Sequence, residues 1–217
     1  MALSATLSNH FKYALANKLI DLDSDIIRIL LMRTGFVFNK ATHSTLSNIK
    51  ATSGALSITF SNSAKTIVRG SGSFIDDGFV VGNKITTDSA NNPGPFYVTT
   101  IADLTITCSA ATFVGETVSK TVTADDELAA NYGYAQDTKE LLGKAIAEND
   151  SGDRMQFTCS NVDWIASGGD IGPMAGAILY DPDSTGDVII GYLSFGENYT
   201  LTDTGMLRLT GIILNLT

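Results

Sequence analysis

The stretch GAILYDPDSTGDVIIGYLSF, residues 176–195, decides the fold of this chain. Two runs rich in Ile, Leu, Val and Tyr flank the turn segment Asp181–Gly186. Proline fixes φ, glycine accepts positive φ, and aspartate hydrogen-bonds its own backbone, so this segment favours a tight turn. The pattern therefore predicts a β-hairpin whose two strands are joined at Asp181–Gly186.

The same pattern recurs over nearly the whole chain of 217 residues: short runs rich in Thr, Val, Ile and Phe, separated by Gly, Asn and Asp. Ile26 to Arg33 is predicted to form a buried strand. Four further strands are expected after residue 153, namely RMQFTCSNVDW, GAILYD, GDVIIGYLSF and LRLTGIILNL. The chain is predicted to be mainly β, with an antiparallel β-sandwich as its principal architecture.

Residues 4–19 are predicted to form the one amphipathic helix of the chain, capped by Ser4. Its apolar stripe, at i, i+4 spacing, consists of Leu7, Phe11, Leu15 and Leu19. This stripe must be covered either by the chain's own sheet or by a neighbouring subunit. Leu7, Phe11 and Leu15 are therefore candidate interface residues.

Residues 63–124 are predicted to form an inserted small β domain, a barrel or sandwich, because their strands are short and their turns tight. The core domain then consists of residues 1–62 and 125–217. Residues 125–150 are richer in Ala, Glu and Lys, and a short helix near 126–131 is possible. A loop is expected to lead from there into a strand near Lys139–Ala147.

The formal net charge is −9, and no run of basic residues occurs. Because affinity for phosphate backbones comes largely from Lys and Arg, nucleic acid and anionic membranes are unsuited as partners. No secretory signal is present, and the apolar run 26–32 is too short to span a bilayer, so a soluble protein made in the cytoplasm is expected. Cys108 and Cys159 are predicted to be buried thiols, with a single disulfide as the alternative.

The best metal candidate is the DPDSTGD turn, whose Asp181, Asp183 and Thr185 fall at positions 1, 3 and 5 of a calcium loop. Position 12, which needs a bidentate glutamate, is Tyr192. The flanking segments are predicted strands rather than helices. An acidic hairpin turn is therefore preferred over a metal site, and no cofactor is expected.

Other reactive groups do not form a recognisable catalytic pattern. The clusters Asp76–Asp77 and Asp125–Glu127 lie beside turns and are predicted to be solvated. Neither His10 nor His43 accompanies a GxSxG motif, and GSGSF at 70–74 lacks the Lys–Ser/Thr of a phosphate loop. The sequence therefore predicts a protein that is not an enzyme.

Aromatic residues offer a different role. Tyr132 and Tyr134, in NYGYAQ, are candidate contact residues. Trp164 is more consistent with a place in the core or at a sheet end.

Several stretches resemble a family of tailed-bacteriophage virion structural proteins: NHFKYALANKLIDLDSDIIRILLMRTGFVFNKATHSTLSNI, DRMQFTCSNVDWIA, GPMAGAILYDPDSTGDVIIGYLSFG and MLRLTGIILNL. The resemblance covers roughly residues 8–48 and 125–217. Residues 64–124 separately resemble a small β module common in phage structural proteins. The matching positions of that module are Gly72, Phe74, Gly78, Phe79, Gly82, Ile85, Phe96, Val98, Leu104 and Glu116. The Pro93–Gly94–Pro95 turn is less usual in it.

The resemblance implies a non-enzymatic virion component, made in the host cytoplasm, with no catalytic residues to carry over. The first hypothesis is a capsid decoration or cement protein that binds the head shell as an oligomer, a trimer being expected. Its partners would be the major capsid protein or other virion proteins. The alternative is a tail- or fibre-associated adhesin or adaptor that contacts host glycan or tail components. That alternative predicts an exposed cluster of Tyr132, Tyr134 and Trp164.

Overall fold

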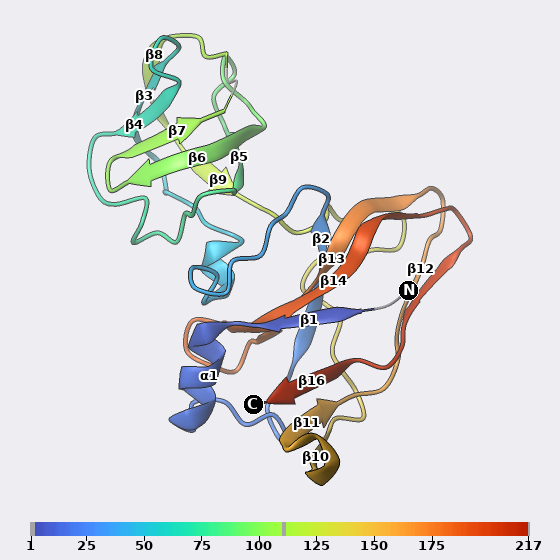
Figure 1. Ribbon diagram of the computed structural model, residues 1–217. Helices are drawn as coiled ribbons and strands as arrows, with labels where there is room; N and C mark the ends of the chain where they lie inside the picture. Colours follow the sequence, from blue (N-terminus) through green and yellow to red (C-terminus); the bar gives the residue numbers. More distant parts are fainter. Residues whose placement is uncertain (1–2, 110–111, 217) are drawn as a thin grey trace. The chain divides into compact units, whose positions relative to one another are not determined.

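The computed structural model describes residues 3–109 and 112–216. The described chain is mainly β, with antiparallel sheets and a single α-helix (Figure 1). It divides into two compact units: Met1–Thr45 with Glu127–Thr217 (unit 1), and Leu46–Asp126 (unit 2). Each unit has a hydrophobic core of its own.

The main sheet of unit 1 is antiparallel and has the strand order β1-β14-β13-β2. Its strands are β1 (Ser4–Leu7), β2 (Arg28–Arg33), β13 (Ile171–Asp181) and β14 (Val188–Leu201). The hairpin predicted from residues 176–195 is confirmed, since β13 pairs with β14 from Asp181 and Val188 onward. The predicted buried strand is also confirmed: Ile29 and Leu31 on one face of β2 and Leu30 and Met32 on the other are all buried.

Two smaller ladders complete the β-structure of unit 1. The first contains β10 (Ala145–Asn149), β11 (Arg154–Thr158) and β16 (Ile213–Leu216), and the second pairs β12 (Val162–Ile165) with β15 (Met206–Leu209). The strands expected at RMQFTCSNVDW and LRLTGIILNL are therefore each broken in two. The pairs Thr158–Ile213 and Val162–Leu209 keep one register across the break. Gly211, at φ +63°, lies in the interruption, as expected where a strand bends.

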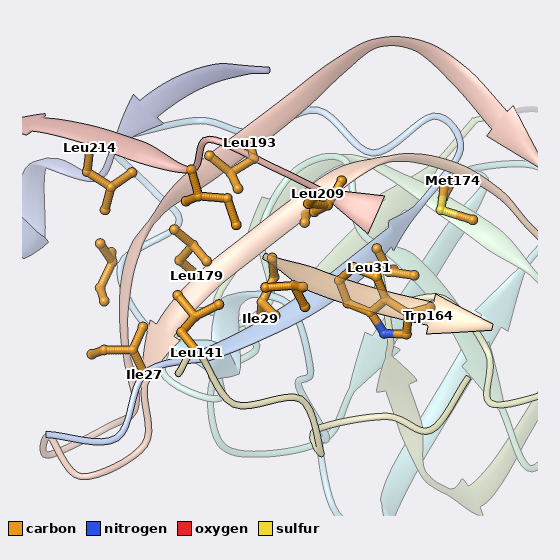
Figure 2. Packing of buried hydrophobic residues seen from close by; sticks show 14 of the residues in the cluster. Ile27, Ile29, Leu31, Leu141, Trp164, Met174, Leu179, Leu193, Leu209 and Leu214 are labelled. Carbon is orange, nitrogen blue, oxygen red and sulfur yellow. The ribbon is translucent and has the colours of Figure 1, made fainter. Parts of the chain in front are cut away.

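The core of unit 1 combines buried side chains of the main sheet with buried side chains of both smaller ladders. Figure 2 shows Ile29 and Leu31 of β2 and Leu179 of β13 pointing toward side chains from other elements. Among these is Trp164 on β12, whose predicted place in the core is confirmed. Burial of such large side chains contributes about 1.5–3 kcal/mol each.

The predicted helix over residues 4–19 is wrong in its first turn. Residues 4–7 form β1, and α1 spans Asn9–Ala16. Ser8, not Ser4, is the N-cap, and its hydroxyl accepts a hydrogen bond from His10 N. Residues 4–7 pair with β14 instead of continuing the helix. Gly191 of β14 permits this pairing, because a Cβ atom at position 191 would lie only 2.6 Å from Thr6 O.

The possible helix near 126–131 does not form. Leu128 N donates a hydrogen bond to Leu31 O at 2.8 Å, and Glu127 forms a bridge with Met32, so this segment runs along β2. The strand expected near Lys139–Ala147 begins later, at Ala145. A short 3-10 helix, η2 (Asp150–Gly152), follows it.

Unit 2 contains a half-barrel sheet of seven described strands with the order β8-β3-β4-β7-β6-β5-β9. The strands are β3 (Leu56–Ser61), β4 (Thr66–Arg69), β5 (Lys84–Thr87), β6 (Phe96–Ala102), β7 (Thr105–Cys108), β8 (Glu116–Lys120) and β9 (Val122–Ala124), preceded by the 3-10 helix η1 (Leu46–Asn48). The edge strands β8 and β9 are separated only by Thr121. The sheet must therefore curl so that the chain can pass from one edge to the other.

Unit 2 begins earlier than the boundary expected at residue 63. The strand β3 lies between β4 and β8 and pairs with both of them. Its Ile58 and Phe60 are buried in the core of unit 2. Strand pairing, which the sequence pattern does not specify, therefore assigns residues 46–62 to this unit.

Candidate interaction surface

The helix α1 has one side in the core and one side exposed. Phe11 and Ala14 are fully buried against the main sheet. Tyr13 is 60% exposed, and Leu19, just beyond the helix, is 57% exposed. The expectation that Phe11 contributes to an interface is wrong, because the core of unit 1 covers this side chain.

A hollow of about 280 Å³ lies on the exposed side of α1. It is lined by Leu7, Lys12, Leu15, Ala16 and Leu216, and is called the helix hollow below. Leu7 and Leu15, the two other candidates predicted on the helix, are half-buried and line this hollow. The neighbouring strand β1 is the edge of the main sheet in the described structure. An apolar hollow beside a strand edge provides both apolar surface and backbone hydrogen-bonding groups.

Tyr132 and Tyr134 differ in their surroundings. Tyr132 is 49% exposed, whereas Tyr134 is only 3% exposed, so its expected contact role is wrong. The Tyr134 hydroxyl donates to Glu127 Oε1 at 2.5 Å and accepts from Leu31 N at 3.0 Å. Burial and the adjacent Glu127 carboxylate raise the pKa of this phenol, which stays protonated. Tyr132, Tyr134 and the buried Trp164 therefore do not form an exposed cluster.

A second hollow, not foreseen from the sequence, contains stacked aromatic rings. Phe38 stacks between His43 and Tyr192, with ring centroids 5.6 and 5.7 Å away, and Phe36 meets Tyr192 edge-on at 5.7 Å. The hollow measures about 390 Å³ and is called the aromatic hollow below. Its lining residues are Thr6, Phe36, Val37, Phe38, Ala175, Tyr192, Ser194, Gly196, Glu197 and Asn198. The FVF run at 36–38 was its only local signal.

His43 lies in a loop that contacts the start of α1. It is buried, and its Nδ1 atom accepts a hydrogen bond from Asn39 N at 2.9 Å. Its carbonyl oxygen accepts a bond from the hydroxyl of Ser8, the helix cap. His43 therefore links the 39–43 loop to the start of α1. His10 lies beside Tyr13 on the helix, at a ring distance of 5.9 Å.

The acidic turn at 181–187 uses its side chains to hold the backbone. Asp181 Oδ1 accepts hydrogen bonds from Asp183 N at 2.8 Å and Ser184 N at 3.1 Å. Asp183 Oδ2 accepts from Ile26 N at 2.8 Å, and Thr185 is exposed. Among residues 3–109 and 112–216, no group of three or more His, Cys, Asp or Glu side chains could hold a metal ion.

Two carboxylates expected in solvated turns are buried instead. Asp126 accepts hydrogen bonds from Asn83 Nδ2 at 2.7 Å and from Lys84 N at 3.0 Å. Glu127 is buried beside Tyr134. The prediction for the 125–127 cluster is therefore wrong for these two residues, because each is needed by a buried donor.

The Asp76–Asp77 pair and the two cysteines also have roles within the fold. Asp76 is exposed, as expected, whereas Asp77 pairs with Arg69 at 2.6 Å. Cys108 and Cys159 are free thiols, in units 2 and 1 respectively. Burial raises the pKa of Cys108 to about 12 and that of Cys159 to about 11, so both remain protonated at neutral pH.

Comparison with known proteins gives this chain no family. No protein-family model, curated protein or solved structure matches it. In the described part of the chain, no helix is long and apolar enough to cross a membrane. The two hollows and the turns described above are therefore the basis for a functional proposal.

Proposed function

We propose that this chain is a non-enzymatic structural protein of a tailed-phage virion, and specifically a decoration protein that binds the head shell as an oligomer. The helix hollow carries this proposal. An apolar depression beside an edge strand suits a partner that buries apolar surface and extends the sheet by backbone hydrogen bonds. The exposed Tyr13 and Leu19 side chains lie on the helix and just beyond it, and would add to the buried area.

The resemblance of residues 8–48 and 125–217 to phage virion proteins supports the same conclusion. In this proposal unit 1 is a β-sandwich formed by the main sheet and the two smaller ladders, and unit 2 is a small β domain inserted into it. A trimer, placed at a symmetric site of the shell, is the oligomer proposed. The major capsid protein would be the other partner.

The proposal is tested by adding the purified protein to phage heads that lack decoration. Saturable, symmetric occupancy in electron-microscopy maps is the expected result, together with a discrete oligomer in light scattering. A protein that stays monomeric and fails to bind the heads at saturating concentration contradicts the proposal.

A pair of variants tests the role of the helix surface. Ala16→Glu places a charge in the helix hollow and is expected to weaken oligomer or head binding at least tenfold. Ala130→Glu is the matched control, because Ala130 is also exposed and in unit 1 but does not line the helix hollow. Equal effects of the two variants contradict a specific role for this surface.

The aromatic hollow favours a second candidate function, that of an adhesin or adaptor. Phe38 and Tyr192 are half-buried and lie beside Glu197 and Asn198, which are exposed. Aromatic surface with a few convergent polar groups is the usual composition of a small-ligand site, and a sugar fits this combination. This site differs from the exposed tyrosine and tryptophan cluster first expected.

A glycan array distinguishes this candidate. Binding of a defined glycan that is lost in Asn198→Ala and retained in Asn91→Ala, a change in unit 2, supports adhesion. Binding that both variants retain places the glycan elsewhere and contradicts the assignment of this hollow.

A further inference from the structure

Two carboxyl groups from separate turns meet near the start of β2. Asp181 is fully buried, and its Oδ1 atom accepts two backbone hydrogen bonds within its own turn. Its Oδ2 atom is buried too, but no donor reaches it from the described residues. The group within hydrogen-bonding reach of Asp181 is the carboxyl of Asp25.

Asp25 is itself held in place by its surroundings. Its Oδ2 atom accepts a hydrogen bond from Asp21 N at 2.6 Å. The ammonium group of Lys144, just before β10, donates to the backbone carbonyl of Asp25. The first bond holds the Asp25 side chain and the second its backbone.

The charged neighbourhood does not neutralise two negative charges at this point. The acidic groups of the two turns are Asp21, Asp23, Asp25, Asp181, Asp183 and Asp187, the cation at the junction is Lys144, and Arg28 lies near Tyr180, Asp137 and Asp187. Asp183 already accepts Ile26 N across the two turns. Burial, and then the charge of Asp25, raise the pKa of Asp181 to about 6.

We propose that the Asp181 carboxyl keeps a proton and donates it in a hydrogen bond to Asp25, which joins the 21–26 turn to the β13–β14 turn, and that loss of this proton loosens the junction. With the proton present, one carboxyl donates to the other, and the buried Oδ2 atom has a partner. Without it, two carboxylates face each other while that of Asp181 is shielded from water, which is unfavourable. The junction is thus a pH-sensitive contact built into the fold.

The consequence reaches the core through β2. Ile26, whose N–H bonds to Asp183, lies directly between Asp25 and the core residue Ile27. Loosening of the junction is expected to increase opening of the 21–27 segment, in which this backbone hydrogen bond is the most direct reporter.

The experiment compares melting of wild type, Asp181→Asn and Asp23→Asn between pH 5 and pH 8. An asparagine at 181 can still accept the two backbone bonds through Oδ1, and its amide can donate to Asp25 at every pH. Asp23→Asn is the matched control, because it removes the same charge from an exposed position in the neighbouring 21–26 turn. The wild type and the control are expected to lose about 4 °C or more of melting temperature as the pH rises, and Asp181→Asn is expected to lose much less.

Two further readouts make the test specific. The side-chain carboxyl carbon of Asp181 is expected to titrate in NMR spectra at a pH well above the ordinary aspartate range. The Ile26 amide hydrogen is expected to exchange with solvent faster at pH 8 than the intrinsic increase of exchange rates with pH explains. Equal pH dependence in Asp181→Asn and Asp23→Asn overturns the proposal. So does an Asp181 carboxyl carbon that titrates within the ordinary aspartate range.

Discussion

The guanidinium group of Arg69 donates a 2.6 Å hydrogen bond to Asp77 Oδ2 while only 4% of the Arg69 side chain is exposed. Its Nε atom donates to Ser71 O at 2.6 Å, and the group lies 4.8 Å from the ring centre of Phe74. One buried cation therefore connects the end of β4 with the turn that follows it. Gly78 completes this turn at φ +95°, where a Cβ atom would lie 2.8 Å from Ser47 O.

Removal of one partner of this pair leaves the other charge buried. We expect Asp77→Ala to destabilise unit 2 by about 2–4 kcal/mol, somewhat less than a fully buried pair, because Asp77 is partly exposed. Asp76→Ala removes a neighbouring exposed aspartate and is expected to change stability by less than about 0.5 kcal/mol. Urea denaturation measures both, and similar losses for the two variants contradict the assigned role of Asp77.

Glu116 holds the turn before β6 in unit 2. It accepts hydrogen bonds from Asn92 Nδ2 at 2.7 Å, Asn91 Nδ2 at 2.9 Å and Ser89 Oγ. These bonds, chiefly that from Ser89, lower the pKa of the Glu116 carboxyl below its ordinary value.

This lowered pKa gives the sign of a pH effect. The unfolded chain takes up the proton first as the pH falls below about 4.5, so the contribution of Glu116 to stability is present above that pH and is lost as the pH falls through the folded pKa. When the free energy of unfolding is measured at decreasing pH, Glu116→Gln is expected to lose less stability than the wild type. Glu197→Gln, an exposed control in unit 1, should retain the wild-type slope.

Tyr134 supplies a buried hydroxyl to β2. We expect Tyr134→Phe to cost about 1–3 kcal/mol, because Leu31 N loses its acceptor and Glu127 loses a donor. Tyr132→Phe, at an exposed position nearby in the chain, is expected to be almost neutral. Thermal denaturation compares them, and a neutral Tyr134→Phe would show that water replaces the hydroxyl.

The boundary of unit 2 predicts the outcome of two excisions. Replacing residues 46–126 by a flexible linker removes a complete sheet, so unit 1 is expected to melt cooperatively. Excising residues 63–124 instead leaves β3 without β4 and β8, and exposes Ile58 and Phe60. This second variant is expected to aggregate, as exposed apolar strands do. If both excisions melt equally well, β3 is not an integral part of unit 2.

The strand content and the 181–186 turn were predictable from residues close together in the chain. The hairpin follows from local turn chemistry, and the buried strand at 26–33 from an apolar run. The helix was misplaced at its start, because the i, i+4 spacing of Leu7 and Phe11 continues through β1, and only pairing with β14 distinguishes the two. Element boundaries of this kind depend on which strand is available as a partner.

The candidate surface was predictable only in part. Leu7 and Leu15 were recognised from their spacing, and both line the helix hollow. Tyr134 and Phe11 looked equally accessible in the sequence, yet both are buried, since an aromatic side chain suits a core as well as a surface. The aromatic hollow brings Phe38 and Tyr192 together from positions far apart in the chain, and no local pattern reports such a meeting.

By itself, the sequence determined that this protein is a β-rich chain with tight turns, because turn formation and alternation of apolar residues are local properties. The tertiary structure alone decided that β3 belongs to unit 2, that Arg69 pairs with Asp77 rather than Asp76, and that Asp181 faces Asp25. These outcomes depend on strand pairing and on exclusion of water between distant segments, and both arise only when the folded chain brings those segments together.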